Sequence, residues 1–338
     1  MLVESADRDR QATGLGATAI VVTYNSADHI TACLNALRRS GVAVHVVDNA
    51  SADGTARLVA QRFADVRLTE NAHNVGFAAA VNQALAQVST DVVLLVNPDC
   101  VLQEGAAKAL VSVVRGNASV GIVGPHLTAP DGSPQFSIHP FESWRSVIAS
   151  RFGGHLLPVG LRRMLSGQRR KDAYDACRAS GPSAPRAPQS VDWLSGACMA
   201  IRTSLLTRLG GLDTGYFMYY EDEDLCLRAW RDGARVLYDP TARAVHVGGA
   251  SSSSNPLVTW PHLYQSMLRF FVLHRRRSFP VVRAAVLFRA FVGIALALLR
   301  TPRRRDEDLA RARAWRQVAR IALAADPRTI ERQNPCTS

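Results

Sequence analysis

The sequence predicts an α/β protein whose core is a doubly wound, mostly parallel β-sheet, followed by a helical C-terminal region. Within the first hundred residues, four short apolar strands alternate with helical segments, which is typical of a parallel sheet covered by helices. Beyond Pro256 the composition changes to leucine, phenylalanine, valine and arginine, which favours a helical extension. With 47% hydrophobic and 20% charged residues, the 338-residue chain is globular, with room for one large domain plus an appendage or for two domains.

Each predicted strand is a short apolar run that stops at polar turn residues. The first run, 17–23, ends at Tyr24-Asn-Ser26, and a helix is expected over roughly 27–39. The turn at 48–54 is dense in helix-capping residues, so a second helix should follow it, and Gly76 should open a third. The predicted strands are 17–23, 42–47, 66–69, 91–96 and 120–123.

The middle of the chain is predicted to be less regular. Asp131 and Gly132 should form the turn of a polar hairpin between Leu127 and Phe136. A stretch rich in Arg, Ser, Gly and Pro is expected to be a mobile basic insertion, after which order returns at Val191. The predicted segments are a disordered tail 1–16, an α/β domain 17–255 with the insertion 153–190 and short strands at 235–240 and 244–247, and a helical region 256–338.

The net charge of +12 and the cysteine content restrict the possible partners. Arginine clusters at 162–171, 275–277 and 300–311 suit an anionic membrane surface or a phosphorylated lipid better than a nucleic-acid groove. Because no nucleic-acid-binding motif accompanies the charge, no nucleic-acid partner is expected. The six cysteines form no CxxC pair and no zinc spacing, which predicts free thiols in a reducing cytoplasm, and residues 1–16 show no signal-peptide pattern.

Polar residues gather at the carboxyl ends of the predicted strands, where ligands bind in doubly wound sheets. Asp48 and Asp99 each directly end an apolar strand, so each is a candidate to bind a base, a ribose or a divalent cation. Asp53 is better explained as the N-cap of the next helix. The polar residues at these ends are Tyr24, Asn25, Asp48, Asn49, Asp53, Asn74, Asn97 and Asp99.

Four consecutive carboxylates, Glu221 to Asp224, follow an aromatic cluster at 216–220 and precede a helical pattern. Acidic side chains are stabilised at a helix N-terminus by the helix dipole, so a solvated acidic first turn is one explanation. Neighbours on a helix point in different directions, so the four carboxylates cannot all share one role. Asp224 is expected to pair with Arg228, four residues further on.

Five motifs in a fixed order resemble glycosyltransferase family 2. The resemblance covers roughly 18–251 and is strongest to bacterial rhamnosyltransferases of cell-wall and O-antigen assembly. It implies a GT-A fold, with a nucleotide-binding half and an acceptor half, and inversion at the anomeric carbon. The motifs are Ile20-Val-Val-Thr-Tyr-Asn25, Val47-Asp-Asn-Ala-Ser-Ala-Asp-Gly54, Asn74-Val-Gly-Phe-Ala-Ala-Ala-Val-Asn82, Asn97-Pro-Asp99, and Glu221-Asp-Glu-Asp-Leu-Cys226 followed by His246.

The resemblance also implies how the donor and its metal would be bound. Asp48 would bind the base or ribose, and Asp99 and His246 would hold Mg²⁺ or Mn²⁺ next to the diphosphate. Asn97 replaces the first Asp of the family's DxD-like element, so one carboxylate of that element rather than two would face the cation. The residues implied to bind the nucleotide are Thr23, Tyr24, Asn25, Asp48, Asn74 and Asn97.

Asp222 is the predicted catalytic base. An inverting transfer is a single displacement, so a base must take the proton of the acceptor hydroxyl on the face opposite the leaving diphosphate. Partial burial by Tyr219 and Tyr220 would raise the pKa of Asp222. Glu221 is the second candidate for the base and is also a candidate acceptor-binding residue. The other residues that resemble the family's acceptor wall are Trp193, which core packing explains equally well, Ser195 and Gly196.

The expected function is transfer of rhamnose from dTDP-rhamnose to a lipid-linked sugar at the cytoplasmic face of the membrane, in cell-wall or surface polysaccharide synthesis. The apolar segment 280–299 contains Arg283 and Arg289, which predicts an interfacial helix with basic ends rather than a spanning one. A helix packed on the domain or at a dimer interface is the alternative. A polyprenyl-diphosphate-linked acceptor would explain both the apolar surface and the arginines.

Three other functions fit parts of the pattern. A transferase that uses a UDP-hexose or UDP-galactofuranose differs only in its donor. A non-catalytic module that binds a sugar nucleotide or a glycan would have no need of a base such as Asp222. A nucleotidyltransferase would be expected to carry a glycine-rich phosphate loop after its first strand, where this chain has Thr23-Tyr-Asn-Ser26.

Overall fold

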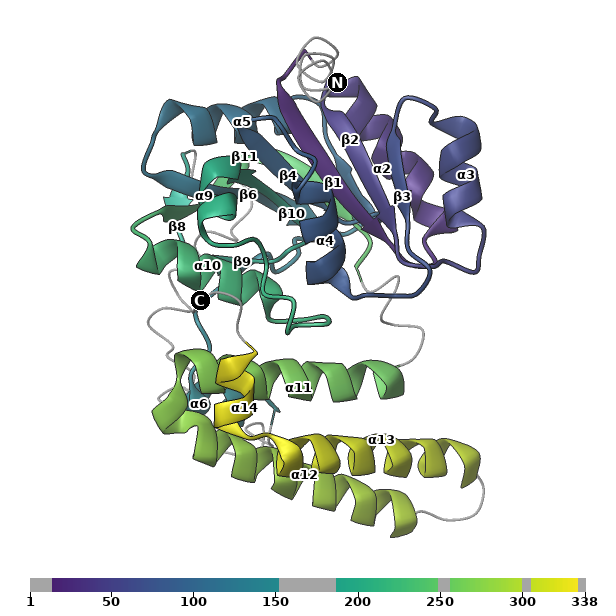
Figure 1. Cartoon of the computed structure of the whole chain (residues 1–338), viewed down its shortest axis with the longest axis vertical. Coiled ribbons are helices and arrows are strands. Elements are labelled where there is room, and N and C mark those ends of the chain that lie inside the picture. Colours follow the sequence, from purple (N-terminus) through teal and green to yellow (C-terminus); the bar gives the residue numbers. More distant parts are fainter. Residues whose placement is uncertain (1–13, 152–186, 249–255, 300–304, 334–338) are drawn as a thin grey trace. The chain divides into compact units, whose positions relative to one another are not determined.

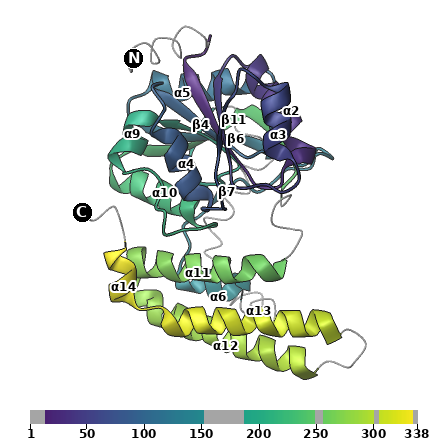
Figure 2. The same ribbon diagram turned by 45° about the vertical axis from the view of Figure 1, so that its right-hand side comes forward.

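The computed structural model describes residues 14–151, 187–248, 256–299 and 305–333, which form two compact units (Figures 1 and 2). The sheet unit comprises the described residues up to Phe141 together with 187–214 and 221–248. The helical unit comprises 142–151, 215–220 and the described residues from Pro256 onward. Most of the predicted N-terminal tail and of the predicted basic insertion lies outside the described residues.

The sheet unit begins with the predicted alternation of strands and helices. β1, β2, β3 and β4 pair in parallel in the order β3-β2-β1-β4. Every residue of β1 and β4 is buried, which explains why both read as continuous apolar runs rather than alternating ones. The elements of this half are β1 (Ala17–Thr23), α2 (Ala27–Arg39), β2 (Ala43–Asp48), α3 (Thr55–Arg62), β3 (Arg67–Glu70), α4 (Phe77–Leu85) and β4 (Val92–Val96).

The second half of the sheet departs from a purely parallel pattern. β10 lies between β4 and β6 and is antiparallel to both, while β11 is parallel to β6 and antiparallel to β5. A small second sheet pairs β7 with β9. The elements are β5 (Cys100–Leu102), α5 (Ala106–Gly116), β6 (Val120–Thr128), β7 (Ile138–His139), β8 (Gln189–Ser190), β9 (Trp193–Leu194), β10 (Cys198–Arg202), α9 (Thr203–Arg208), α10 (Glu221–Arg231) and β11 (Arg235–His246).

The prediction of two short strands at 235–240 and 244–247 is wrong, because both belong to the single strand β11. The pairing register of β11 with β6 shifts between Asp239 and Arg243. Pro240 lies in this irregular stretch and has no N–H to donate to a ladder, which explains why the sequence pattern appears interrupted there. The hairpin around Asp131 is confirmed by the bond from the Ala129 N–H to the Ser133 carbonyl, 2.8 Å.

Helices cover both faces of the sheet. One core cluster places residues of α2 and α5, such as Leu34 and Leu110, against the odd-numbered side chains of β1. The other cluster places α4, α9 and α10 against the opposite face, where Ile20 and Leu95 point. This doubly wound arrangement agrees with the predicted fold class and leaves the carboxyl ends of β1, β2 and β4 open to form a site.

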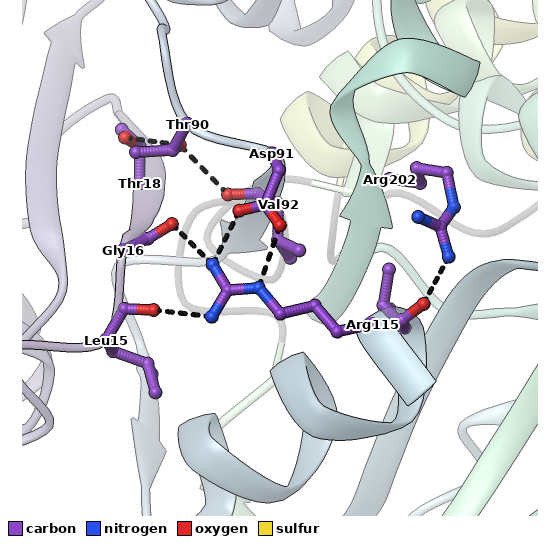
Figure 3. Close-up of polar contacts among 9 residues, drawn as sticks. Leu15, Gly16, Thr18, Thr90, Asp91, Val92, Arg115 and Arg202 are labelled. Atoms are coloured by element: carbon purple, nitrogen blue, oxygen red, sulfur yellow. Dashed lines mark hydrogen bonds and ion pairs between the residues drawn. The ribbon is translucent and has the colours of Figure 1, made fainter. Parts of the chain in front are cut away.

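The end of the sheet where β1 and β4 begin is held by one arginine, Arg115 of α5 (Figure 3). Its guanidinium makes a bidentate pair with Asp91, at 2.8 and 2.5 Å. It also donates to the carbonyls of Leu15 and Gly16, at 2.9 and 2.8 Å. The side chain therefore joins α5 to the start of β1 and to the residue before β4.

We expect Arg115→Met to lower the free energy of unfolding by about 1–2 kcal/mol, because charge-assisted bonds to two carbonyls are lost with the ion pair. Arg38 is the matched control, since it makes an exposed ion pair with Asp65 at 2.9 Å. Arg38→Met should cost less than about 1 kcal/mol. Urea unfolding of both variants checks this, and equal losses would show that the carbonyl bonds of Arg115 contribute nothing.

The helical unit is built from long helices that pack side by side (Figure 1). α12 and α13 lie along each other, and both contact α11. By length and composition the segment Arg276–Leu299 is the one candidate membrane span among the described residues, and the mean hydropathy of an 18-residue window within it is 2.1. The elements are α6 (Trp144–Arg151), α11 (Pro256–His274), the 3₁₀ turn η2 (Arg276–Ser278), α12 (Phe279–Leu299), α13 (Arg305–Ala324) and α14 (Pro327–Arg332).

Candidate active site

The carboxyl ends of β1 and β2 are joined by the buried carboxylate of Asp48. The Thr23 hydroxyl donates to Asp48 Oδ1 at 2.7 Å, and the Ser51 hydroxyl donates to the same oxygen at 2.6 Å. The Ser51 N–H binds the other oxygen, Oδ2, at 2.9 Å. Two predicted residues, Thr23 and Asp48, therefore share a fixed polar cluster at the strand ends. Ser51, which was not predicted, completes it.

The loop after β1 is held against the loop after β2 by Asn25. Its side-chain carbonyl accepts from the Ala52 N–H at 2.8 Å, and its own N–H donates to the Ser51 hydroxyl at 2.9 Å. Asn25 and Ala50 both have positive φ, 51° and 60°, conformations that non-glycine residues rarely adopt. Tyr24, between these contacts, is 43% exposed. Asn25 thus fixes the two loops against each other, and Tyr24 remains an accessible aromatic side chain beside them.

Asp53 lies one position before the N-cap of α3, which is Gly54, but its carboxylate still binds the first residues of two helices. Its Oδ2 accepts from the Ala27 N–H at the start of α2, and its Oδ1 accepts from the N–H and hydroxyl of Thr55 in α3. Burial opposes ionisation, but these hydrogen bonds outweigh it, so the pKa of Asp53 is lowered. One carboxylate thereby orients the first turns of two helices.

Asn74 lies in a loop that is tied back to the end of β2. Its side-chain carbonyl accepts from the N–H of Gly76 at 2.9 Å, and the carbonyl of Gly76 accepts from the side-chain amide of buried Asn49 at 3.2 Å. Gly76 has φ 86° and ψ 167°, a conformation essentially restricted to glycine, so the start of α4 depends on this residue. The loop thus stands beside the Asp48 cluster rather than apart from it.

Asp99, just beyond β4, meets His246 at the end of β11. Asp99 Oδ1 lies 3.3 Å from His246 Nε2, and Asp99 Oδ2 accepts from the Gly248 N–H at 3.1 Å. The other ring nitrogen of His246 bonds the Gln135 side-chain carbonyl at 2.9 Å, and the Gln135 amide donates to the His246 carbonyl. Burial opposes ionisation of Asp99, but the contacts with His246 and Gly248 prevail and lower its pKa.

The Asp99–His246 pair has the chemistry of a divalent-metal site. A carboxylate oxygen from the turn after β4 meets an imidazole nitrogen at the end of β11, and Gln135 fixes the orientation of the imidazole as an outer-shell partner does. No group of three or more His, Cys, Asp or Glu that could hold a metal occurs in the described residues. The pair fits a cation whose remaining ligands are diphosphate oxygens and water, a mode that Mg²⁺ commonly uses.

Asp222, in the first turn of α10, is held by the backbone of two segments. Its Oδ2 accepts from the Gly196 N–H and its Oδ1 from the Glu223 N–H, both at 2.9 Å. Burial raises the pKa of Asp222 although both hydrogen bonds oppose the shift. A half-buried carboxylate with a raised pKa and fixed orientation has the properties of a general base.

The remaining carboxylates of α10 have separate environments. Asp224 pairs with Arg228 at 2.7 Å, as expected, and both Glu223 and Asp224 are buried. The explanation of a solvated acidic first turn is therefore wrong. Glu221 Oε2 is buried and has no hydrogen-bond partner among the described residues. Burial and the neighbouring charge of Asp222 raise the pKa of Glu221 to about 8.

Glu221 makes folding stability depend on pH. Its pKa is raised above the ordinary value of 4.5, so the folded protein binds a proton that the unfolded chain releases. The stability it contributes is complete below pH 4.5 and is lost as the pH rises towards about 8. We expect Glu221→Gln to remove about 3 kcal/mol of this pH dependence. Urea unfolding of both proteins at pH 5 and pH 8.5 measures it, and parallel pH profiles would contradict the assignment.

The predicted acceptor residues form a short aromatic and polar wall. Trp193 stacks on His139 with ring centroids 4.4 Å apart, and its indole N–H donates to the Pro140 carbonyl at 3.0 Å. The Ser195 N–H donates to the Ser137 carbonyl at 2.8 Å. Because Trp193 is half-buried, it both packs on the small β7–β9 sheet and keeps part of its surface open.

One backbone bond connects the two halves of the candidate site. The N–H of Asn97, after β4, donates to the Ala197 carbonyl at 2.9 Å. Gly196, the residue before Ala197, donates to Asp222. The chain segment that carries Asp99 is therefore connected through hydrogen bonds to the predicted base.

Sequence reasoning did not identify Ser51 and Gln135. Ser51 stands within a predicted polar turn, whereas no local pattern marks Gln135.

A mostly parallel sheet in which β10 runs antiparallel between β4 and β6, with polar strand ends and two carboxylate centres, defines a glycosyltransferase of GT-A type, and known proteins share this fold. The model of glycosyl transferase family 2 matches residues 18–170. N-acetylglucosaminyl-diphospho-decaprenol L-rhamnosyltransferase of Mycobacterium tuberculosis is 31% identical over 251 residues, covering 70% of this chain and 78% of that protein. The chain belongs to glycosyltransferase family 2.

Further relatives are consistent with this membership. Rhamnosyltransferase WbbL of Escherichia coli K12 is 50% identical over 56 residues, 17% of this chain and 21% of that protein. Two solved structures share the fold at lower identity. GalNAc-T7 with UDP, GalNAc and Mn²⁺ aligns with a TM-score of 0.55 at 12% identity, over 95% of this chain and 58% of that one. Mannosyltransferase PcManGT from Pyrobaculum calidifontis, with GDP-Man and Mn²⁺, aligns with a TM-score of 0.50 at 19% identity, over 96% of this chain and 94% of that one.

Proposed function

We propose that this enzyme is an inverting, metal-dependent rhamnosyltransferase. It takes rhamnose from dTDP-rhamnose and adds it to a polyprenyl-diphosphate-linked sugar at the cytoplasmic face of the membrane, in cell-wall or surface polysaccharide synthesis. The names of two relatives specify rhamnosyl transfer, and one of them specifies a diphospho-decaprenol acceptor. The main support for the mechanism is the environment of Asp222, whose carboxylate has a raised pKa and is oriented by two backbone N–H groups.

The donor nucleotide is assigned to the Asp48 cluster. Asp48 binds the base or ribose, and the hydrogen bonds from Thr23 and Ser51 fix its carboxylate before the ligand arrives. Asn25 and Tyr24 line one side of the pocket, and Asn74 and Asn97 line the strand ends beyond it. Tyr24 is exposed enough to contact the base, whereas Asn25 acts chiefly by holding the loop.

Asp99 and His246 would hold Mg²⁺ or Mn²⁺ against the diphosphate. When bound, the metal stabilises the negative charge that grows on the leaving nucleoside diphosphate. The chain's own contribution is to fix both ligands. Gly248 positions the Asp99 carboxylate, and Gln135 sets which nitrogen of His246 faces Asp99.

Asp222 removes the proton of the acceptor hydroxyl as that oxygen attacks the anomeric carbon. The Gly196 N–H binds the carboxylate of the base, so a hydrogen bond links the acceptor wall directly to Asp222. Glu221 is predominantly protonated at neutral pH because its pKa is about 8, so it is suited to donate a hydrogen bond to the acceptor rather than to act as the base. Trp193 is half-buried, so part of its indole surface is available to contact a sugar.

A binding titration with dTDP, UDP and GDP, each with and without Mn²⁺, tests the donor assignment. We expect dTDP to bind at least about tenfold more tightly than UDP or GDP, and only in the presence of metal. Preference for UDP would replace the donor by a UDP-hexose or UDP-galactofuranose and leave the transferase intact. Failure of every nucleotide to bind would contradict the assignment of the Asp48 cluster.

A further inference from the structure

α12 has two distinct faces within the helical unit. Its buried side chains recur every three or four residues and contact neighbouring helices. Gly293 lies so close to Trp315 of α13 that a β-carbon there would be 2.5 Å from the indole ring. The opposite side is apolar and exposed, with Phe288 70% and Leu299 80% accessible. The exposed apolar residues are Val281, Ala284, Phe288, Phe291, Ala295, Leu296, Leu298 and Leu299.

The two arginines inside α12 do not belong to this exposed face. The Arg283 guanidinium donates to the carbonyls of Ala322 and Leu323, at 2.8 and 2.9 Å, where it meets the negative end of the α13 dipole. The Arg289 guanidinium lies over the Trp315 ring, 4.9 Å from its centroid. Both cations are therefore engaged by α13, and the outer face of α12 carries no charged side chain between Phe279 and Leu299.

The packing of α13 decides how this face can meet a bilayer. α13 lies along α12, and its sequence holds eight charged residues between Arg305 and Arg320. Three of its arginines, Arg313, Arg316 and Arg320, are exposed. If α12 crossed the membrane with its partner attached, these charges would enter hydrocarbon at a cost of a few kcal/mol each. The pair can instead lie in the interface with only the outer face of α12 immersed.

The charge of the region complements an anionic surface. Residues 256–338 contain 16 arginines and no lysine against 5 carboxylates, a net charge of +11 within a whole-chain charge of +12. Arg276 and Arg277 are exposed immediately before α12, although Arg276 also pairs with Glu331. Each cation near an anionic bilayer contributes about 1 kcal/mol of attraction. A second copy of the chain, equally basic, would lack this complementarity.

We propose that the outer face of α12 is a membrane-docking surface for an anionic phospholipid bilayer, immersed in the interface with α12 and α13 still paired. The proposal deepens the membrane location assigned above but does not depend on the donor, the acceptor or catalysis. Arg283 and Arg289 hold the helix pair together and are not part of the surface that meets the lipid.

Sedimentation of the full-length protein with phospholipid vesicles tests the proposal. Wild type should bind phosphatidylglycerol-containing vesicles and bind phosphatidylcholine vesicles at least about tenfold more weakly. Phe288→Ser should lower the partition coefficient about five- to tenfold, and the double variant with Phe291→Ser about 30-fold or more. Because both side chains are exposed, neither change should affect folding, and nucleotide binding should be unchanged.

Phe136 provides a matched control, since it is 66% exposed in the sheet unit. Phe136→Ser should leave vesicle binding unchanged. Wild-type vesicle binding by the double variant would overturn the proposal. So would a double variant that loses self-association in analytical ultracentrifugation but keeps vesicle binding, because the face would then be a contact between copies. If wild type and all variants failed to bind nucleotide, this would contradict the proposed donor site but not the membrane-docking surface.

Depth measurements separate the interfacial arrangement from a spanning one. A fluorophore is attached to Phe291→Cys or to Arg313→Cys in a chain whose Cys177 and Cys336 are replaced by serine, because the other four cysteines are buried. We expect shallow nitroxide-labelled lipids to quench the label at 291 and aqueous iodide to quench the label at 313. The proposal would be contradicted if lipids with the nitroxide near the bilayer centre quenched the label at 291 most strongly and the label at 313 were shielded from iodide.

Discussion

Asp222→Asn is expected to lower kcat by about 10³-fold while leaving the affinity for the donor nucleotide within about twofold. The amide oxygen can still accept the Gly196 N–H, whereas the NH2 group cannot accept the Glu223 N–H, so one of the two backbone contacts that orient the side chain is kept. The amide cannot take a proton from the acceptor hydroxyl. The loss therefore measures proton removal in the transition state rather than binding, and single-turnover kinetics with saturating acceptor would detect it.

Glu221→Gln is the matched control for the neighbouring carboxylate. If Glu221 is protonated at neutral pH, glutamine preserves a hydrogen-bond donor, and the change should raise KM for the acceptor more than it lowers kcat. The opposite pattern, with Glu221→Gln inactive and Asp222→Asn active, would move the role of base to Glu221. It would also contradict the interpretation of the Gly196 contact as an orienting one.

Asp99→Asn is expected to weaken Mn²⁺ binding, and with it metal-dependent donor binding, by about 10²-fold. Asparagine can still accept the Gly248 N–H, but it presents no negative charge to the cation or to His246. Calorimetric titration with Mn²⁺, in the presence of dTDP, gives a readout that does not depend on catalysis.

Asp131→Asn makes the same chemical change outside the candidate site and serves as its control. Asp131 accepts from the Ser133 N–H and hydroxyl in the exposed hairpin turn. This substitution should leave metal and nucleotide binding unchanged, which excludes a general effect of net charge. If Asp99→Asn bound Mn²⁺ as tightly as wild type, the metal would have to be held elsewhere.

The parallel half of the sheet could be predicted because its strands are defined locally. β1 and β4 are buried on both faces, so their sequences are continuous apolar runs between turn residues. β10 was not identified as an antiparallel neighbour of β4, because its place between β4 and β6 is set by tertiary pairing. β11 was divided in two because Pro240 interrupts its pattern without ending it.

The sequence identified many of the residues of the candidate site, but it did not predict most of the contacts between them. Asp99 and His246 were named from the resemblance, and the structure places them 3.3 Å apart from strands far apart in sequence. The contact of Gly196 with Asp222 joins two named residues whose separation of 26 positions gives no local signal. Gln135 was missed for the same physical reason, since hydrogen bonding to His246 depends on the packing of a hairpin against β11.

The direction of the arginines in α12 shows a further limit of sequence reasoning. Arg283 and Arg289 interrupt an apolar segment, which argues against a spanning helix but does not say what the two guanidinium groups contact. The structure turns both towards α13, where backbone carbonyls and an indole ring engage them. Helical periodicity alone places them at the edges of the buried face, but only the neighbouring helix determines their partners.

The most direct measurement is a transfer assay with purified protein, dTDP-rhamnose and a polyprenyl-diphosphate-linked sugar, with the anomeric configuration of the product determined by NMR. We predict metal-dependent transfer of rhamnose with a configuration opposite to that of the donor, and loss of transfer in Asp222→Asn. Retention of the donor configuration, or undiminished transfer by Asp222→Asn, would contradict a single displacement assisted by this carboxylate.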